Sequence, residues 1–101
     1  FAGACWESSP SSPVNAPTAA RKCAARGGTL PEALQLAAFA EEPGISLSGG
    51  DEWSSDILSF SSEDVYAVAT VSQGGNIDAG LFNAGGVKET HAYRCVVPLV
   101  R

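Results

Sequence analysis

The 101-residue sequence predicts a single α+β domain, residues 1–101, in which two helices pack on an antiparallel sheet. Its length is close to the commonest size of one domain. Apolar residues make up 45% of the chain and charged residues only 17%, a balance typical of a packed core. Apolar residues recur at helical spacing in the first half, whereas alternating and β-branched runs fill the second half. We therefore expect one core to which the whole chain contributes.

The chain is expected to begin with a short strand at residues 4–6, followed by a loop at residues 7–13. Two prolines in the second segment lack the backbone N–H that a regular ladder needs. In the strand, alternation turns either Cys5 or Trp6 inward and the other outward. The Ser/Pro-rich stretch is interpreted as a loop within one domain rather than a linker between two.

The first helix is expected to be capped by Asn15 or Thr18, whose side chains can accept hydrogen bonds from the first turn. Cys23 should lie on a face of this helix that carries small apolar side chains. Gly27 and Gly28 should end the helix, because glycine readily takes the left-handed conformation of a helix C-terminus.

The second helix is expected at about residues 30–42. Thr29 to Glu32 has the spacing of a capping box and holds a proline where the first turn tolerates it. Leu34 and Ala38 recur at helical spacing, so both are predicted to be buried. Pro43 should end the helix.

The rest of the sequence predicts an antiparallel β-meander, because β-branched and aromatic runs are separated by glycine-rich turn signals. The turns are expected at residues 74–76 and 84–86. The predicted strands are residues 53–60, 65–71, 77–82 and 87–100.

The net charge of −5 argues against binding to nucleic acid or to an anionic membrane, because both need clustered basic residues. The six basic residues are scattered. No apolar run approaches the roughly 20 residues of a membrane span, so membrane insertion is not expected, and none has the pattern of a signal peptide. Since the chain starts at Phe1 rather than Met, we expect a processed mature protein or a piece of a longer one.

The three cysteines, Cys5, Cys23 and Cys95, have no C-x-x-C spacing, and His91 is their only companion as a metal ligand. A zinc site is therefore not expected. Two interpretations fit: three buried thiols, or one disulfide with a thiol left over. We favour the disulfide, which implies an oxidising compartment and an extracellular or cell-surface location.

The residues from Cys23 to Pro31, in one-letter code CAARGGTLP, and the ending Arg94-Cys95-Val96 resemble the C-type lectin-like fold of bacterial surface proteins. A comparable ending occurs in its formylglycine-generating, sulfatase-modifying branch. The resemblance implies that the first and last strands are neighbours and that Cys23 is bridged to Cys95, leaving Cys5 free or available to another chain. A Cys5–Cys95 bridge is the competing pair if those two strands lie side by side.

Two departures from the family limit what the resemblance implies about function. The sequence lacks the Glu-Pro-Asn or Gln-Pro-Asp triplet and the Trp-Asn-Asp triplet of calcium-dependent sugar-binding lectins. Cys95 has the position of the structural bridge, not that of the reactive cysteines of formylglycine-generating enzymes. Alternation on the last strand would place Tyr93 and Val97 inside with Cys95, and Arg94 and Val96 on the other face.

Acidic residues cluster around Trp53, and calcium prefers several such oxygens. The spaced acids and central glycine of a calcium loop are missing, so a solvated acidic surface is favoured and neither a metal nor a cofactor is expected. The residues of this cluster are Asp51, Glu52, Asp56, Glu63 and Asp64.

Other candidate groups also have ordinary structural interpretations. His91 is the only histidine and no Gly-x-Ser-x-Gly elbow is present, so a catalytic triad is not expected. Trp6 and Trp53 could stack on a sugar, but for Trp53 a core position is favoured because large aromatics usually fill a small core.

The sequence thus predicts a non-catalytic extracellular recognition or adhesion module, not an enzyme, which binds a protein or glycan through surface loops. The structure of residues 48–62 and 73–86 would show whether these loops form a pocket. The module could act alone, within a larger surface protein, or as a homo-oligomer.

The alternative is a structural subunit that self-associates into a fibre or coat through the apolar residues 96–100. A hydrolase or modifying enzyme is the third hypothesis.

Overall fold

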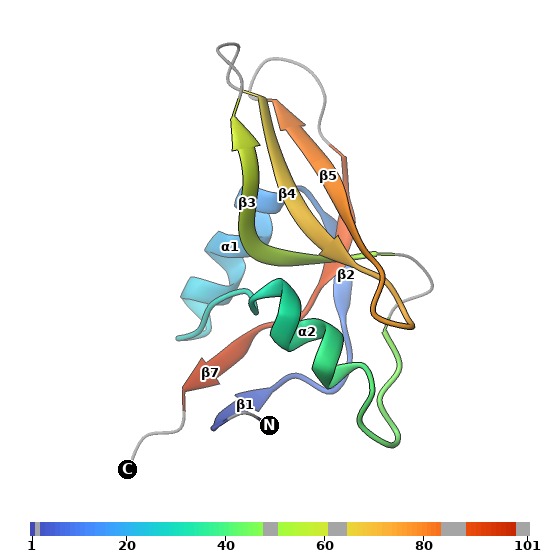
Figure 1. Cartoon of the computed structure of the whole chain (residues 1–101). Coiled ribbons are helices and arrows are strands. Elements are labelled where there is room, and N and C mark those ends of the chain that lie inside the picture. The colour runs from blue at the N-terminus through green and yellow to red at the C-terminus, as the bar shows by residue number, and fades with distance from the viewer. Residues whose placement is uncertain (2, 48–50, 61–64, 84–88, 99–101) are drawn as a thin grey trace.

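The computed structural model describes residues 1, 3–47, 51–60, 65–83 and 89–98, and it has an α+β architecture (Figure 1). Within these residues, two helices and seven strands follow one another. In chain order they are β1 (Ala4–Trp6), β2 (Ser11–Val14), α1 (Ala16–Ala25), α2 (Ala33–Phe39), β3 (Glu52–Phe60), β4 (Val65–Val71), β5 (Ile77–Asn83), β6 (His91–Tyr93) and β7 (Val96–Pro98).

The main sheet has the strand order β2-β6-β3-β4-β5. Strands β3, β4 and β5 form the predicted antiparallel meander, and Gly74 and Gly75, with φ of 95° and 82°, make the turn between β4 and β5. The sheet is nevertheless mixed, because β3 meets β6 in parallel at Glu52. The register of β3 against β4 shifts after Trp53. Irregularities of this kind allow a strand to bend. Figure 1 shows this bend, which turns the start of β3 toward β6.

The first and last strands are neighbours, as the resemblance implied. Strand β1 pairs with β7 in a separate two-stranded antiparallel sheet, with Trp6 opposite Val96. On its other side, Val96 exchanges backbone hydrogen bonds of 2.8 and 2.9 Å with Thr29. Val96 is therefore paired on both sides, and residues 99–100 of the predicted apolar edge lie outside the described residues.

The prediction of one continuous last strand is wrong, because the strand is interrupted at Arg94 and Cys95. The backbone N–H of Cys95 donates to the Glu7 carboxylate at 2.7 Å, and the Cys95 carbonyl accepts from the Glu7 N–H at 3.2 Å. These backbone groups of Cys95 therefore bond to Glu7, the residue that follows β1, and do not continue a strand ladder. On either side of this interruption, β6 and β7 pair with different strands.

Helix α1 begins and ends as the sequence predicts. The Asn15 side chain accepts a 3.0 Å hydrogen bond from the Thr18 N–H. At the other end, Gly27 has a φ of 81° and the Gly28 N–H donates to the Cys23 carbonyl at 2.9 Å. A Cβ at Gly28 would overlap the Val96 carbonyl oxygen, so glycine allows the helix exit to approach β7.

Residues 11–14 form strand β2 instead of the predicted loop. The strand lies at one end of the main sheet, and its register against β6 is irregular. Pro13 is compatible with this position, because an edge strand leaves one side of its backbone without ladder bonds.

Helix α2 is shorter than predicted, and its capping box does not form. Both backbone groups of Thr29 bond to Val96, which keeps this residue outside the helix, and Glu32 has the N-cap position instead. The helix starts only at Ala33, whose N–H donates to the Asp56 carboxylate of β3 at 3.0 Å. The cap therefore comes from a strand that is distant in the sequence.

The predicted buried face of α2 is also wrong. Leu34 is 76% exposed and Ala38 is exposed, whereas Leu36 is fully buried and Phe39 is 6% exposed. Each residue rotates the helix by about 100°, so Leu34 and Ala38 share one side of α2, and the side that faces β4 carries Ala33 and Leu36 instead. Leu36 and Ala33 then pack on β4 in a cluster that also contains Leu47, Ala69 and Val71.

A second cluster lies beneath α1 and contains the fully buried Trp53, as predicted. The Trp53 indole N–H donates to the Val14 carbonyl at 2.7 Å. Its remaining buried members are Ala16, Ala19, Cys23, Leu30, Val68, Tyr93 and Cys95.

Changing Leu36 to Ala is expected to lower the free energy of unfolding by about 2 to 5 kcal/mol, because a fully buried leucine leaves a cavity. Changing Leu34 to Ala should cost less than about 0.5 kcal/mol, as at other surface positions. Urea unfolding of both variants measures the difference. Equal losses would contradict the register of α2 described above.

Candidate functional site

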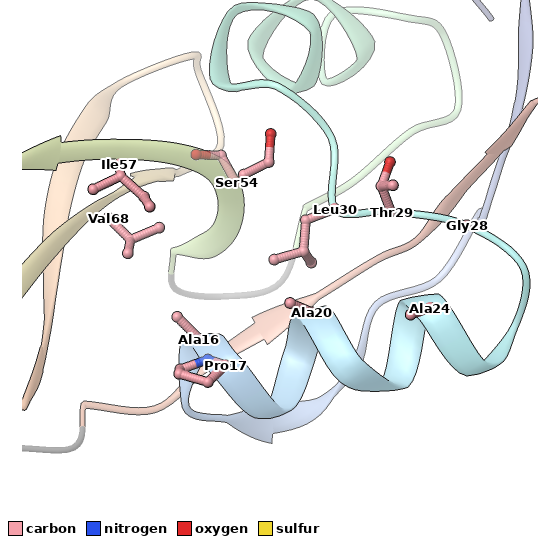
Figure 2. Close-up of a pocket in the computed structure, with 11 residues that line it drawn as sticks. Ala16, Pro17, Ala20, Ala24, Gly28, Thr29, Leu30, Ser54, Ile57 and Val68 are labelled. Carbon is pink, nitrogen blue, oxygen red and sulfur yellow. The ribbon is translucent and has the colours of Figure 1, made fainter. Parts of the chain in front are cut away.

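An open groove of about 610 Å³ lies between α1 and the first half of β3 (Figure 2). Its volume is within the range of about 300 to 1,000 Å³ that is typical of ligand pockets. Small, apolar and hydroxyl-bearing residues line it: Ala16, Pro17, Ala20, Ala24, Gly28, Thr29, Leu30, Ser54, Ser55, Ile57 and Val68.

One wall of the groove is a face of α1 that carries only small side chains. Ala16, Ala20 and Ala24 are four residues apart, so they lie one above another on this face. Ala16 is buried, whereas Ala20 and Ala24 are exposed. The adjoining face of the same helix carries Cys23 into the core. The groove therefore exists because methyl groups stand where larger side chains would fill the space between helix and sheet.

The floor and the opposite wall are also apolar. Leu30 and Val68 are 7% and 8% exposed, and they connect the groove to the core beneath α1. Ile57 stands on the bent part of β3 and is 55% exposed, and Leu58 beside it is 53% exposed. An occupant of the groove would cover part of the exposed surface of Ile57.

The hydroxyl groups at the groove fall into two kinds. Ser54 is fully buried, and its Oγ donates to the Ala69 carbonyl at 2.7 Å and accepts from the Asp56 N–H at 3.1 Å. Ser54 therefore holds the strands together. Thr29 and Ser55 are exposed, and their hydroxyls make no hydrogen bond to another described residue, so both can bond to a ligand.

None of the described lining residues is ionisable. General acid–base catalysis requires a group that takes up and releases a proton within reach of the reacting atoms. The described lining offers burial for apolar groups and two hydroxyls that could orient a ligand.

The acidic residues singled out in the sequence have separate structural partners. The Asp51 carboxylate accepts from the Thr70 hydroxyl at 2.8 Å, and the Asp56 carboxylate caps α2. Glu52 is fully buried against Arg94. Glu63 and Asp64 lie outside the described residues. In the part of the chain that is described, no group of three or more His, Cys, Asp or Glu side chains is arranged to hold a metal ion.

His91 and the two tryptophans belong to packed contacts. The His91 ring stands edge-on to Trp53 at 4.7 Å between ring centres, and its Nε2 lies 3.2 Å from the Glu89 carboxylate. Trp6 is half-buried, stacks on Phe39 at 4.5 Å, and donates its indole N–H to the Phe1 carbonyl. Trp53 thus has no ring face open to a sugar, and one face of Trp6 is covered.

Cys23 and Cys95 form a disulfide with a Cα–Cα distance of 5.3 Å, as the resemblance implied. Both residues are fully buried in the cluster beneath α1. Cys5 is free and exposed on β1. The competing Cys5–Cys95 bridge is absent although β1 and β7 are neighbours, because Cys5 lies opposite Val97 instead.

The fully buried ion pair between Arg94 and Glu52 was not predicted from the sequence. The guanidinium makes two bonds to the carboxylate, of 2.7 Å from Nε and 2.8 Å from Nη2. It also donates to the backbone carbonyls of Glu7, Ser8 and Ser46, and it lies 5.5 Å from the centre of the Phe39 ring. Strand alternation only placed Arg94 on the face opposite Cys95, and it gave no reason to expect burial.

The groove was not foreseen either, although the alanines at spacing four were visible in the sequence. The loops expected to bind a ligand contribute only Ser54, Ser55 and Ile57 to it. Residues 48–50, 61–62 and 84–86 of those loops lie outside the described residues.

Comparison with protein-family models, with curated proteins and with solved structures found no match to the chain. Among the described residues, neither helix is long and apolar enough to cross a lipid bilayer.

Proposed function

We propose that the domain is a non-catalytic recognition module that acts outside the cell and binds a protein partner in the groove beside α1. The observation that carries the proposal is the open groove of about 610 Å³ without an ionisable lining residue among those described. Binding there would remove apolar surface from water, which is the main driving force of most protein association.

A protein segment fits this groove better than a glycan does. Sugars are bound by aromatic faces and by many polar side chains, and the described lining residues include no aromatic ring. Thr29 and Ser55 provide two free hydroxyls, enough to orient a peptide backbone but few for a sugar. Ile57, which lines the groove and is 55% exposed, would extend the apolar contact to the surface.

The disulfide supports the proposed extracellular location. Cys23–Cys95 is a structural bridge in the core, and such bridges persist in oxidising compartments. The alternative of a fibre subunit that pairs through β7 is less supported, because Val96 already has backbone partners on both sides.

Changing Ala24 to Glu is expected to abolish binding in the groove without unfolding the domain. Ala24 is exposed and lines the groove, so the glutamate would place an unpaired charge among apolar groups. The matched control is Ala25→Glu, the same change at the next residue of α1, which is also exposed but does not line the groove.

The probe is a displayed library of random peptides, selected on the unmodified domain and measured by calorimetry. Selected peptides should be rich in apolar residues, and Ala24→Glu should weaken them at least about tenfold while Ala25→Glu changes affinity less than about twofold. Peptides that bind both variants equally well would contradict the proposal. A glycan array binding the unmodified domain but not Ala24→Glu would assign the groove to a sugar instead.

A further inference from the structure

The outer edge of β5 is a second candidate surface, because its backbone N–H and C=O groups are not paired with a described strand. β5 is the last strand of the main sheet, and among the described residues no strand pairs with its outer side. It pairs with β4 along all seven residues, Ile77 to Asn83, without a bulge. The strand contains no proline or lysine, and Asp78 is its only charged residue. Long regular edges of this kind are templates for pairing with another strand.

The turn between β4 and β5 shows which backbone groups face outward. The Ser72 N–H donates to the Asn76 carbonyl at 2.9 Å, so these two residues form a hydrogen-bonded pair. In an antiparallel ladder, hydrogen-bonded and non-hydrogen-bonded pairs alternate. Residues 78, 80 and 82 therefore bond to β4, whereas the backbone groups of residues 77, 79, 81 and 83 point away from the sheet.

The Asp78 side chain occupies one of these outward groups. Its Oδ1 accepts a 2.8 Å hydrogen bond from the Ala79 N–H, which confirms that this N–H is not used by β4. Both residues are exposed. Asp78 thus covers a donor near the middle of the edge and places a negative charge beside it, a common way in which edge strands avoid pairing.

We propose that the β5 edge is a pairing surface for a second copy of this chain, and that the Asp78 carboxylate limits this pairing. Two copies of β5 can join antiparallel around a two-fold axis at Ala79, so that residue 77 of each copy faces residue 81 of the other. The outward N–H and C=O groups of one β5 strand then bond to the same groups of the other β5 strand. The two main sheets thereby form one continuous sheet. In this arrangement, the second copy alone supplies hydrogen-bond partners for the outward backbone groups of β5.

The same register explains why Asp78 matters. It places Asp78 opposite Gly80 of the second copy, where Trp53 and His91 of that copy occupy the space over the glycine. Strand spacing and rise put the two Asp78 Cα atoms about 8 Å apart. That separation is shorter than the Debye length of about 10 Å at 0.1 M salt, so the two charges repel each other. Removing the carboxylate would end this repulsion and free the Ala79 N–H.

Asp78→Ala is expected to raise the dimer association constant at least about tenfold over the unmodified domain, measured by sedimentation equilibrium. Asp78→Asn should have a smaller effect, because the amide oxygen can still accept from the Ala79 N–H. The matched control is Glu41→Gln, which removes one exposed charge after α2 and should leave association unchanged. Association of the unmodified domain should increase with salt, because salt screens the repulsion.

Two further measurements locate the contact. Adding Ala79→Pro or Ile77→Lys to Asp78→Ala should restore the monomer, because proline removes the outward N–H and lysine adds an exposed charge. In the Asp78→Ala dimer, hydrogen exchange should slow at the Ile77 and Ala79 amides. The proposal is overturned by any one of three results: no rise in association, an equal rise in Glu41→Gln, or a dimer with unchanged exchange at these two amides.

Discussion

Replacing Arg94 with Met is expected to lower the free energy of unfolding by about 3 to 5 kcal/mol, which is a large part of the stability of a small domain. The guanidinium and the Glu52 carboxylate are both fully buried and joined by two short hydrogen bonds. The substitution removes the counter-charge from the carboxylate and the donors from the carbonyls of Glu7, Ser8 and Ser46. A buried acceptor that loses its donor keeps the full cost of its desolvation.

Two control variants separate the ion pair from a general effect of losing an arginine. Arg21→Met removes an exposed guanidinium that bonds to Thr18 and to no other residue in the described part of the chain, so it should cost less than about 0.5 kcal/mol. Arg94→Met combined with Glu52→Gln should recover part of the loss, because replacing both charges of a buried pair is often close to neutral. Urea unfolding at one pH measures all three. A loss under about 1 kcal/mol for Arg94→Met alone would contradict the role assigned to this pair.

Removing the disulfide with Cys23→Ala and Cys95→Ala is expected to cost on the order of 4 kcal/mol in the chain-entropy model. The bridge joins residues that are 72 positions apart, so it closes most of the chain into a loop. Both residues are also fully buried, and their loss would leave small cavities beneath α1. Chemical denaturation of the double variant measures this cost.

The control for this variant is Cys5→Ser, which changes the exposed free cysteine and should leave stability within about 0.5 kcal/mol. Peptide mapping without reduction should recover Cys23 linked to Cys95, and alkylation should label Cys5. A linked pair that contains Cys5 and Cys95, with Cys23 alkylated, would refute the assigned connectivity.

Features fixed by neighbouring residues could be predicted from the sequence. Helix α1 begins at an Asn15 side chain that bonds three residues ahead, and it ends at a glycine in the left-handed region. The turn at Gly74 and Gly75 is equally local. In these cases both partners of the deciding hydrogen bond lie within a few residues, so a sequence pattern contains them.

Features decided by distant partners could not be predicted. Thr29 has the right spacing for a capping box, but its backbone bonds to Val96, and Asp56 caps α2 in its place. The burial of Arg94 depends on carbonyls from loops far apart in the chain, which alternation on one strand does not reveal. The alanine spacing on α1 was visible, but the groove also requires the bend of β3 that holds Ile57 apart from the helix.

The contacts of Arg94 also bear on how the domain folds. Its guanidinium joins the segment after β1, the segment before β3 and β3 itself, and Cys95 beside it closes the bridge to α1. During synthesis, the first 93 residues leave the ribosome before any of these bonds can form. The cluster beneath α1 therefore lacks Tyr93 and Cys95 until the last strands have been made. Closure by such distant contacts slows folding, and a chain with an incomplete core is prone to aggregation.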